Sequence, residues 1–537
     1  MDTVSYDIKR LDHLGVVAGT IRDLGIVELI DKIFGTDKRE EISIGESIAG
    51  MVINGLGFTS QPLSLTERFF NKKPLELLFG RNDIESKYFN RNKLSKTLDK
   101  IYNYGCEKLF YQISLAACSK ANISLRCSSL DTTSISVTGE YDKDSDENSI
   151  KVTHGFSKDH RSDLKQCVHE LLVSQDGGVP LMMKSYSGNS PDSKIFKERT
   201  KMLIANFKAS NEPRYLIADG KLYCSANAEN LSQIKFITRI SSTLSIVKDA
   251  IFTAFSNNNN WVKINKEDKY TSVTIEHYGI NQRWLIVKTV QSESRARKRI
   301  IKVINKEYED YTKKIKDFSK FTFSSKEEAI ANLEILCSKL QYHKLLQHNI
   351  IVSELDGKNI YSILGSLCKD PAKEQYNIML SSCFVIGTNI DALEINDFDV
   401  IKLYKNQNIA IENTGFRFLK DPKFFTQSFF IKKPERIEAL LFVMTLALLI
   451  YSIAQRHLRQ EMEKQQKEVP NQINKATRKP TLRWVFQLLE DIHVLYRKID
   501  NKIELIIDGF LDLKQKIIGF FSNSVQDIYH GKISYCA

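Results

Sequence analysis

The stretch ISLRCSSLDTTSIS, residues 123–136, decides how this chain is expected to fold. Every second residue from Ile123 to Asp131 falls on one side, which is the alternation of a half-buried β-strand. A second stretch, YLIADGKLYC at residues 215–224, repeats the arrangement, with Asp219 on the apolar side. Two apolar strands therefore each end in an acid on the inward side.

One such aspartate has an ordinary explanation, because a strand-end Asp commonly opens a turn or caps a helix. Two inward carboxylates need a further explanation, because moving an ionised acid out of water costs free energy unless a cation or hydrogen bonds compensate. If the sheet brings Asp131 and Asp219 together, they indicate a shared metal site. The sequence leaves open whether it does.

Composition indicates a folded, basic, multidomain protein. The chain has 537 residues with 42% hydrophobic content and only 10 prolines, and its net charge is +12. This length exceeds one ordinary core, so about three or four domains are expected. The positive balance favours a polyanionic partner such as nucleic acid.

Cysteine usage and apolar patterning bear on location. The 9 cysteines form no CxxC pair, which favours reduced thiols in a cytoplasmic protein and no zinc site. The N-terminus lacks the pattern of a secretory signal. The longest apolar run, residues 439–454, is shorter than the roughly 20 residues that span a bilayer. We therefore expect a buried core helix and no membrane partner.

Changes of pattern along the chain suggest five segments. Residues 1–120 show helical spacing with glycines at the ends, and residues 121–256 alternate strands and helices. Residues 257–371 include a hairpin pattern and are expected to be a β-rich insertion, with a basic helix over residues 292–318. The α/β pattern resumes over residues 372–457, and residues 458–537 are expected to be a helical C-terminal region. The fold class is therefore an interrupted α/β domain flanked by helical regions.

A third acid is sought after the last strand, in YKNQNIAIENTGFRFLKDPKFF at residues 404–425. Here the chain resembles the DDE transposases of bacterial insertion sequences that carry a β-rich insertion before the third acid. LDTTSIS, HGFSKDHRSDLKQ, PLMMKSYSGNSPD, YLIADGKLYCSANAENL, FVIGTN and FRFLKDPKFF occur in the family's order. The resemblance covers nearly the whole chain and implies an RNase H-like catalytic domain, with a DNA-end-binding domain at residues 1–120.

The resemblance also implies residue roles. Asp131, Asp219 and Glu412 would be the metal ligands, and the DNA-binding signature would comprise Tyr404, Gln407, Arg417 and Lys420. Gln407 stands where the family usually has arginine, and the spacings on both sides of Glu412 are each one residue longer than usual. In strict register the acid position falls on Asn413, a poor Mg²⁺ ligand. We therefore expect Glu412 with a local bulge, and Glu438 is the reserve candidate.

The implied chemistry is metal-dependent DNA cleavage at element ends and strand transfer into target DNA. Two Mg²⁺ ions, with Mn²⁺ able to substitute, would be held by carboxylates, which suit hard cations. Partners would be double-stranded DNA, both the terminal inverted repeats and the target, and a second copy of the chain bound on DNA. The protein would work in the bacterial cytoplasm, associated with the nucleoid.

Two other functions remain open, a metal-dependent nuclease that does not join ends and an inactive transposase-derived DNA-binding protein. A metal role for His154, His160 and His169 is disfavoured, because their spacing fits no zinc pattern. The basic run RARKR, residues 295–299, fits either a DNA contact or a solvated helix face.

Overall fold

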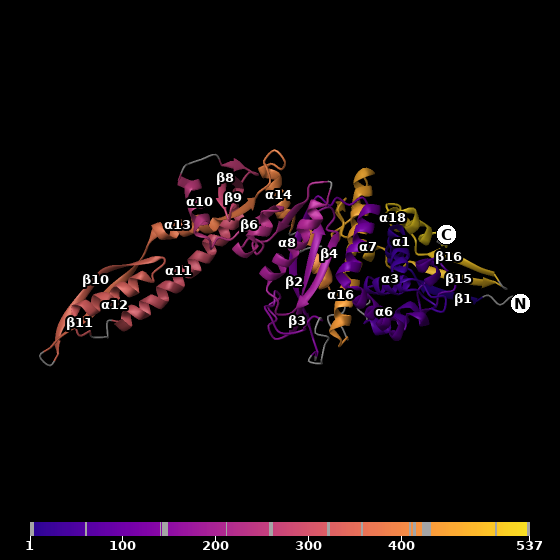
Figure 1. Ribbon diagram of the computed structural model, residues 1–537, viewed down its shortest axis with the longest axis horizontal. Helices are drawn as coiled ribbons and strands as arrows, with labels where there is room; N and C mark the ends of the chain where they lie inside the picture. Colours follow the sequence, from indigo (N-terminus) through magenta and orange to yellow (C-terminus); the bar gives the residue numbers. More distant parts are fainter. Residues whose placement is uncertain are drawn as a thin grey trace. The chain divides into compact units, whose positions relative to one another are not determined.

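The structure is a computed structural model that describes residues 5–58, 62–139, 141, 149–210, 212–256, 261–318, 323–355, 358–407, 410–411, 415–421, 431–499 and 502–533. The chain divides into two compact units: unit 1 is Met1–Lys235 with Lys402–Ala537, and unit 2 is Phe236–Ile401. Each unit is a mixture of helices and strands (Figure 1). The predicted mixed α/β class is confirmed at this level.

The sheet of unit 1 is built around the first predicted strand. Its order is β4-β3-β2-β5, with bounds Cys127–Val137 for β2, Lys165–Ser174 for β3, Pro180–Ser187 for β4 and Tyr215–Ala218 for β5. The first three strands form an antiparallel meander, whereas β5 is parallel to β2. The connection from β4 to β5 contains α8, Asp192–Lys208. Parallel pairing places the carboxyl end of β5 beside the middle of β2, because β2 continues to Val137. Asp131 therefore lies within its strand, contrary to the expectation that the strand ends there, since the polar residues after Asp131 still pair with β3.

The N-terminal part of unit 1 is mostly helical, as predicted. Its helices are α1 Leu14–Leu24, α2 Ile26–Phe34, α3 Ile44–Gly55, α4 Thr66–Phe70, α5 Leu75–Phe79, α6 Arg91–Tyr104 and α7 Cys106–Lys120. Gly25 separates α1 from α2 because it adopts a left-handed conformation, with φ of 58°. The next helix, α3, begins at a reciprocal capping box between Ser43 and Glu46.

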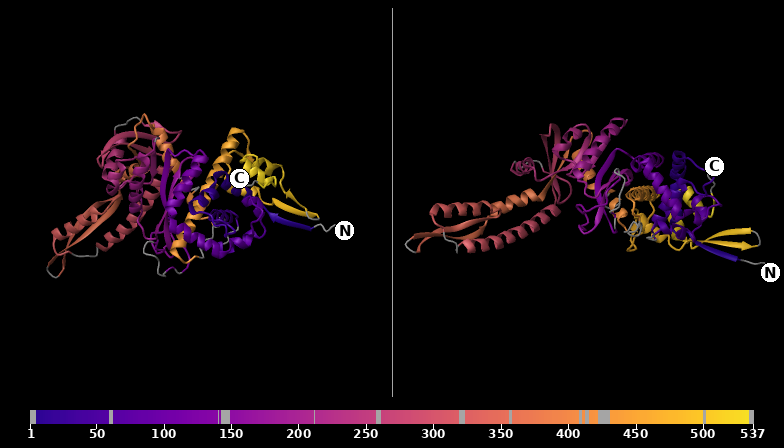
Figure 2. Two further views of the ribbon diagram at one scale, coloured as in Figure 1. Left: turned by 45° about the vertical axis from the view of Figure 1, so that its right-hand side comes forward. Right: turned by 60° about the horizontal axis from the view of Figure 1, so that its bottom comes forward.

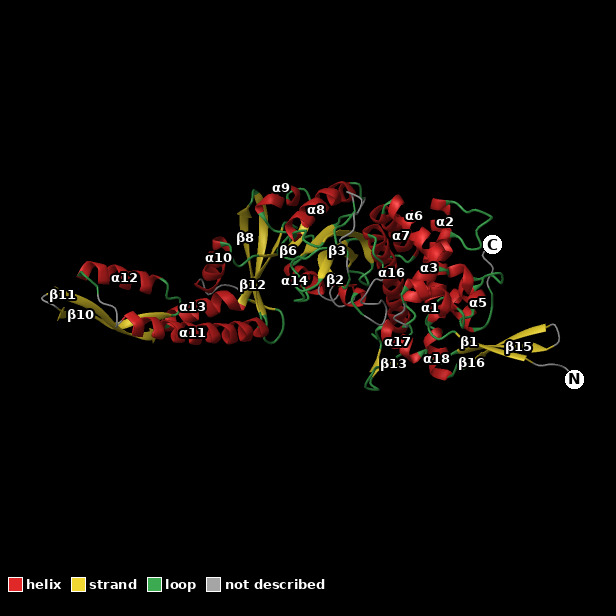
Figure 3. Cartoon of the chain, turned by 90° about the horizontal axis from the view of Figure 1, so that it is seen from below, coloured by secondary structure: helices red, strands yellow, loops and turns green. Residues whose placement is uncertain are grey.

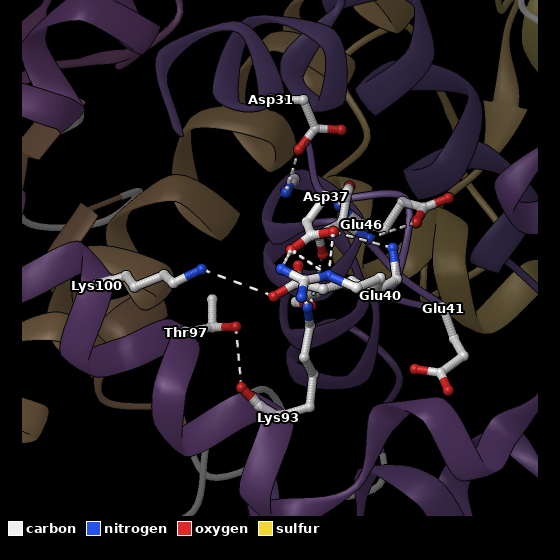
Figure 4. A network of polar contacts seen from close by, with 12 residues as sticks. Asp31, Asp37, Glu40, Glu41, Glu46, Lys93, Thr97 and Lys100 are labelled. Atoms are coloured by element: carbon white, nitrogen blue, oxygen red, sulfur yellow. Dashed lines mark hydrogen bonds and ion pairs between the residues drawn. The ribbon is translucent and has the colours of Figure 1, made fainter. Parts of the chain in front are cut away.

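Polar contacts tie three of these helices together near the start of α3 (Figure 4). Asp31 on α2 accepts a hydrogen bond of 2.7 Å from a backbone N–H at the beginning of α3. Lys93 on α6 forms an ion pair of 2.8 Å with Glu40, in the loop before α3. The sequence between α2 and α3 is therefore held at both ends by charged partners.

The apolar run at residues 439–454 lies inside α16, Pro434–Lys464. Within the described residues this is the one helix long and apolar enough to cross a membrane, and 94% of its most apolar window is buried inside the protein. It packs against α1, α3, α6 and α7 on one side and against β4 on the other (Figure 1). The expectation of a buried core helix is confirmed.

The C-terminal region is not purely helical, contrary to the prediction. Besides α17 Leu482–Leu488, α18 Asp512–Ile518 and α19 Asn523–Tyr529, it contains β13 Val469–Pro470, β14 Ala476–Thr477, β15 His493–Ile499 and β16 Lys502–Asp508. The N-terminal strand β1, Ser5–Arg10, pairs with β15 (Figure 2). Helix α1 also packs against α19. The two ends of the chain therefore belong to one packed body.

Unit 2 contains five sheet strands in the order β6-β12-β9-β8-β7 and a separate hairpin, β10-β11. The strand bounds are β6 Lys235–Ile240, β7 Val262–Lys263, β8 Lys269–His277, β9 Ile280–Lys288, β10 His343–Leu355, β11 Lys358–Lys369 and β12 Cys383–Thr388. The predicted hairpin is confirmed, with its turn at Tyr278 and Gly279, which have φ of 57° and 69°. Positive φ at both positions is the type I′ geometry that suits two-residue hairpin turns.

The segment predicted as β-rich also holds long helices (Figure 3). These are α11 Val290–Phe318 and α12 Lys326–Ser338, and α10 Ser245–Ser256 and α13 Pro371–Ser382 flank the segment. Helix α11 is amphipathic and buries Ile300 and Ile304 in a cluster with Tyr342 and Ile378. Helix α11 contains the basic helix that the sequence predicts in this segment, whereas α12 was not predicted, and strands β7 to β11 form its β-rich part.

Candidate active site

Asp131 and Asp219 are brought together by the pairing of β2 with β5. In this parallel pair Leu130 lies opposite Ala218, and the two aspartates directly follow these residues. Neighbouring strands are about 4.8 Å apart, so the two carboxylates leave the backbone at adjacent positions, where β5 ends beside β2. Asp131 is buried, with 8% of its surface exposed, and Asp219 is half-buried.

Lys158 places a positive charge beside the first aspartate. Its Nζ lies 3.6 Å from Asp131 Oδ1 and donates a hydrogen bond of 2.8 Å to Thr132 Oγ1. The backbone N–H of Lys158 donates to Ser134 Oγ at 2.9 Å, which ties its loop to β2. Asp131 also accepts a hydrogen bond of 2.7 Å from the backbone N–H of Thr132. The orientation of the Asp131 carboxylate is therefore fixed from two sides.

A third acid at this edge, Asp192, was not predicted. It is the first residue of α8, and its Oδ1 accepts a hydrogen bond of 2.7 Å from Thr132 Oγ1. Its other oxygen forms ion pairs with Lys221 and, at 3.8 Å, with Lys158. Its sequence context, a proline followed by an acid, is the ordinary start of a helix. Only its contacts in the structure distinguish Asp192 from an ordinary acid at the start of a helix.

The acids and lysines of this cluster change one another's pKa values. Burial raises the pKa of Asp219, and the nearby Asp192 charge adds to the increase. Burial would also raise the pKa of Asp192, but hydrogen bonds from Lys221 and Thr132 outweigh it and lower that pKa. Burial opposes the charge of Lys221, yet Asp192, Asp219 and Asp131 raise its pKa. Asp192 and Lys221 therefore stabilise each other as charged groups, whereas burial disfavours the charged form of Asp219.

The donor set at this edge suits a hard divalent cation, because carboxylate oxygens are the ligands that Mg²⁺ prefers. Among the described residues, however, no group of three or more His, Cys, Asp or Glu side chains is arranged to hold a metal ion. The predicted third ligand, Glu412, and its neighbour Asn413 lie outside the described residues. Asp131 and Asp219 thus fit as part of a metal site.

The described residues on both sides of Glu412 share an unusual helical geometry. Ala410, Ile411, Gly415 and Phe416 are π-helical. A π-turn inside a helix accommodates an additional residue, and such turns are frequent at functional sites. The sequence spacings around Glu412 are each one residue longer than the family signature. The π-helical geometry of the flanking residues is compatible with one extra residue here, and the assignment of Glu412 stays a prediction.

The helix that carries Tyr404 and Gln407 is docked on the strand that carries Asp131. Helix α14, Asp397–Gln407, accepts a hydrogen bond of 2.8 Å at Leu403 O from Gln175, whose amide also donates to Ser129 on β2. Gln407 is buried and donates a hydrogen bond of 3.5 Å to Leu130 O. Tyr404 is half-buried on the same helix. The position of Gln407 suits support of β2, directly before Asp131.

Lys420 is connected to the cluster through one loop. Its Nζ forms an ion pair of 2.7 Å with Asp159, the residue that follows Lys158. Arg417, in the short helix α15 (Arg417–Leu419), is exposed and lies one turn before Lys420. Lys420 is therefore linked to the acid cluster through the loop of Lys158 and Asp159, and the roles of Lys420 and Arg417 as phosphate contacts stay predictions.

Glu438, the reserve candidate, has other neighbours. The charges that act on it are those of Lys184 on β4 and Glu107 on α7, and burial raises its pKa to about 7. His169 is also structural: it is buried, it contacts Ser185 and Thr445 through hydrogen bonds, and burial lowers its pKa to about 3. None of these contacts involves Asp131 or Asp219.

The basic run at residues 295–299 lies on α11 of unit 2, where Arg295, Arg297, Lys298 and Arg299 are exposed. Arg297 forms an ion pair of 2.7 Å with Glu293, and Arg299 donates to Ser381. These contacts are those of a solvated helix face, and a DNA contact by this run stays a prediction.

Comparisons with known proteins place these features in context. Residues 124–450, more than half of the chain, match the family model described as "Transposase DDE domain", and residues 6–115 match one described as "Domain of unknown function (DUF4277)". Among solved structures the chain is similar to one described as "Cryo-EM structure of piggyBac transposase synaptic complex with hairpin DNA", with 9% identity, 89% of this chain and 79% of that chain covered, and a TM-score of 0.36. A search of curated proteins gives no match.

Proposed function

The chain belongs to the DDE transposase family, and from this premise we propose that it cuts DNA at the ends of a bacterial insertion sequence and joins the freed ends to target DNA. The observation that supports the proposal most directly is the parallel pairing of β2 and β5, which sets Asp131 beside Asp219. The catalytic unit is proposed to be an RNase H-like domain built on the sheet of unit 1.

Asp131, Asp219 and Glu412 would hold two Mg²⁺ ions, and Mn²⁺ would substitute. When bound, such a pair activates the attacking oxygen and stabilises the leaving oxygen of an in-line displacement. The chain's own residues orient the first ligand: Thr132 donates its backbone N–H to Asp131, and Lys158 lies beside the same carboxylate. Lys221, held by Asp192, balances negative charge at the same edge.

The reaction needs no protein nucleophile. In the first step a water oxygen attacks phosphorus, the bond from phosphorus to the 3′ oxygen breaks, and that oxygen leaves as a hydroxyl. In the second step this 3′-hydroxyl attacks a phosphodiester of the target, and the displaced 3′ oxygen takes the proton. Arg417 and Lys420 would contact the DNA phosphates next to the reacting group, and Tyr404 would lie on the same path. Gln407 would act by supporting β2.

Double-stranded DNA at the terminal repeats and at the target is the proposed substrate, and the productive form would hold two element ends with at least two chains. The packed body formed by both chain ends is available to help hold such an assembly. With DNA as its substrate, the protein would act in the bacterial cytoplasm, on the nucleoid.

The test is a nicking and joining assay on labelled DNA that carries the repeats flanking the gene. Asp131→Ala and Asp219→Ala should lose cleavage by several orders of magnitude in Mg²⁺ and Mn²⁺, while DNA affinity changes little, because affinity comes mainly from Lys and Arg at phosphates. Asp163→Ala is a matched control, since this exposed acid pairs only with Arg161 in the described residues.

The outcomes separate the competing functions. Cleavage without joining would make the protein a nuclease, and DNA binding without cleavage in either metal would make it an inactive relative. Near wild-type cleavage by both aspartate variants would overturn the assignment of the site. Glu412→Gln and Asn413→Ala identify the third ligand, because only the first should abolish cleavage.

A further inference from the structure

A basic cleft in unit 1 lies next to α15, and of its lining residues only Arg417 has a role in the chemistry proposed above. Its volume is about 790 Å³, and residues of α15, α16, α17 and the β13–β14 hairpin line it. Four cationic side chains border it: Arg417, Arg459, Lys479 and Arg483. Asp421 is the one acidic residue among its described lining residues, so the cleft has a strong positive balance.

Among the described residues, most of this positive charge has no carboxylate partner. Asp421 forms an ion pair with Arg483. In the described part of the chain, Arg417, Arg459 and Lys479 form no ion pair. Arg459 is half-buried, its Nε donates to Pro480 O at 2.9 Å, and burial lowers its pKa. A guanidinium removed from water without a carboxylate is costly, so the cleft is built to receive an anion.

We propose that this cleft, here called the α16–α17 cleft, binds the phosphodiester backbone of duplex DNA next to the cut. The inference rests on the proposed function and extends it to residues that the DDE signature does not include. Arg417 connects the two regions, because it borders the cleft and lies one turn from Lys420, which pairs with Asp159 beside the acid cluster. DNA that reaches the acids over Lys420 and Arg417 therefore continues into the cleft.

The size and lining favour a DNA strand over a small anion. Cations come from α15, α16, the segment before α17, and α17 itself, so they are spread along the cleft and do not form a single pocket for one phosphate. Trp484 also lines it, and its indole N–H donates to Pro470 O at 2.8 Å, which fixes the ring. A fixed aromatic side chain provides a surface for a sugar or base beside bound phosphates.

The experiment measures the salt dependence of binding of the full chain to a labelled 30-base-pair duplex. Each phosphate contact removed should reduce the slope of log K against log salt by about 0.9. The Lys479→Gln variant is expected to lower this slope by about 0.9, which corresponds to one lost phosphate contact. The double variant Arg459→Gln with Lys479→Gln should lower it by about twice as much, for two lost contacts. Lys479 is exposed, so its substitution should not impair folding, and Arg459→Lys retains the charge at the partly buried position. The control is Lys208→Gln, at the far end of α8 from Asp192.

Trp484 gives a second readout. Duplex DNA should quench its fluorescence, and Trp484→Phe should abolish that change. Inorganic phosphate alone should neither quench at millimolar concentration nor displace the duplex; if it does both, the cleft is a small-anion site and the proposal is overturned. Unchanged slopes in the cleft variants overturn it as well. Cleavage by the wild-type protein is measured in a separate assay. The assignment of the cleft can therefore fail while the transposase function is supported, and the transposase function can fail while the cleft still binds duplex DNA.

Discussion

Replacing Glu438 by glutamine should stabilise the protein above neutral pH. Glu438 lies near the start of α16, half-buried, and faces Lys184 and Glu107. Burial, the dominant cause, raises its pKa from 4.5 to about 7, and the repulsion from Glu107 adds to the increase. A carboxyl whose pKa is raised on folding costs stability wherever the unfolded chain would ionise it.

The sign and the size follow from the two pKa values. Below pH 4.5 the group is protonated in both states and contributes nothing. Between pH 4.5 and about 7 the unfolded chain releases the proton first, so stability falls as pH rises, and above 7 the full cost remains. The difference of about 2.5 pKa units corresponds to about 3.4 kcal/mol at 1.36 kcal/mol per unit. Partial exposure of the side chain reduces this to about 2 kcal/mol.

Thermal unfolding of the Glu438→Gln variant measures this gain between pH 4.5 and 8.5. For a unit of this length, about 2 kcal/mol should raise Tm by about 2–3 °C at pH 8, with no gain at pH 4.5. Glu435→Gln is the matched control in the same helix, and it should show no gain that grows with pH. Glu438→Gln should also retain DNA cleavage. A loss of Tm at pH 8 would refute the reasoning on burial, and a loss of cleavage would return Glu438 to the list of metal ligands.

Three further predictions concern the interior, the acid cluster and assembly. The Arg199→Met variant leaves the buried Glu170 without its cation and should lower the free energy of unfolding by about 3–5 kcal/mol. Adding Glu170→Gln in a double variant should restore part of this loss, and a Tm of Arg199→Met equal to that of wild type would contradict the prediction. The Asp192→Asn variant removes the carboxylate that holds Lys221, so the single-turnover cleavage rate should fall about 10–100-fold with little change in DNA affinity. An unchanged rate would show that the contact between Asp192 and Lys221 is only structural. Light scattering should find at least two chains on two element ends during reaction, and one chain per end throughout would be incompatible with the proposed assembly.

The strands that carry the two aspartates were predictable because each has a strict local pattern. Alternation of apolar residues identifies a strand and the side on which its last residue lies. Alternation carries no information about which strands pair. The parallel register that sets Leu130 opposite Ala218 joins residues almost ninety positions apart, so the juxtaposition of Asp131 and Asp219 needed the structure.

The elements that were missed depend on distant partners. Strand β1 is short and leaves Tyr6 and Ile8 largely exposed, at 61% and 60%, so it lacks the apolar side that marks a strand. It is a strand because its backbone pairs with β15, from the other end of the chain. Asp192 was missed for a similar reason, since its partners Lys221 and Thr132 lie on separate segments.

The described residues on both sides of Glu412 bear on the spacing of the signature, although Glu412 itself lies outside the described residues. In a regular α-helix one additional residue rotates every later side chain by about 100°, which would turn either the acid or the following signature residues away from the site. Ile411 and Phe416 are both buried, so the helix faces on either side of Glu412 are both fixed by packing. The π-helical geometry of these flanking residues is the known means of absorbing one extra residue between two fixed faces. This geometry agrees with one extra residue between Ile411 and Phe416, and the choice of Glu412 over Asn413 as the third ligand stays a prediction that the Glu412→Gln and Asn413→Ala variants test.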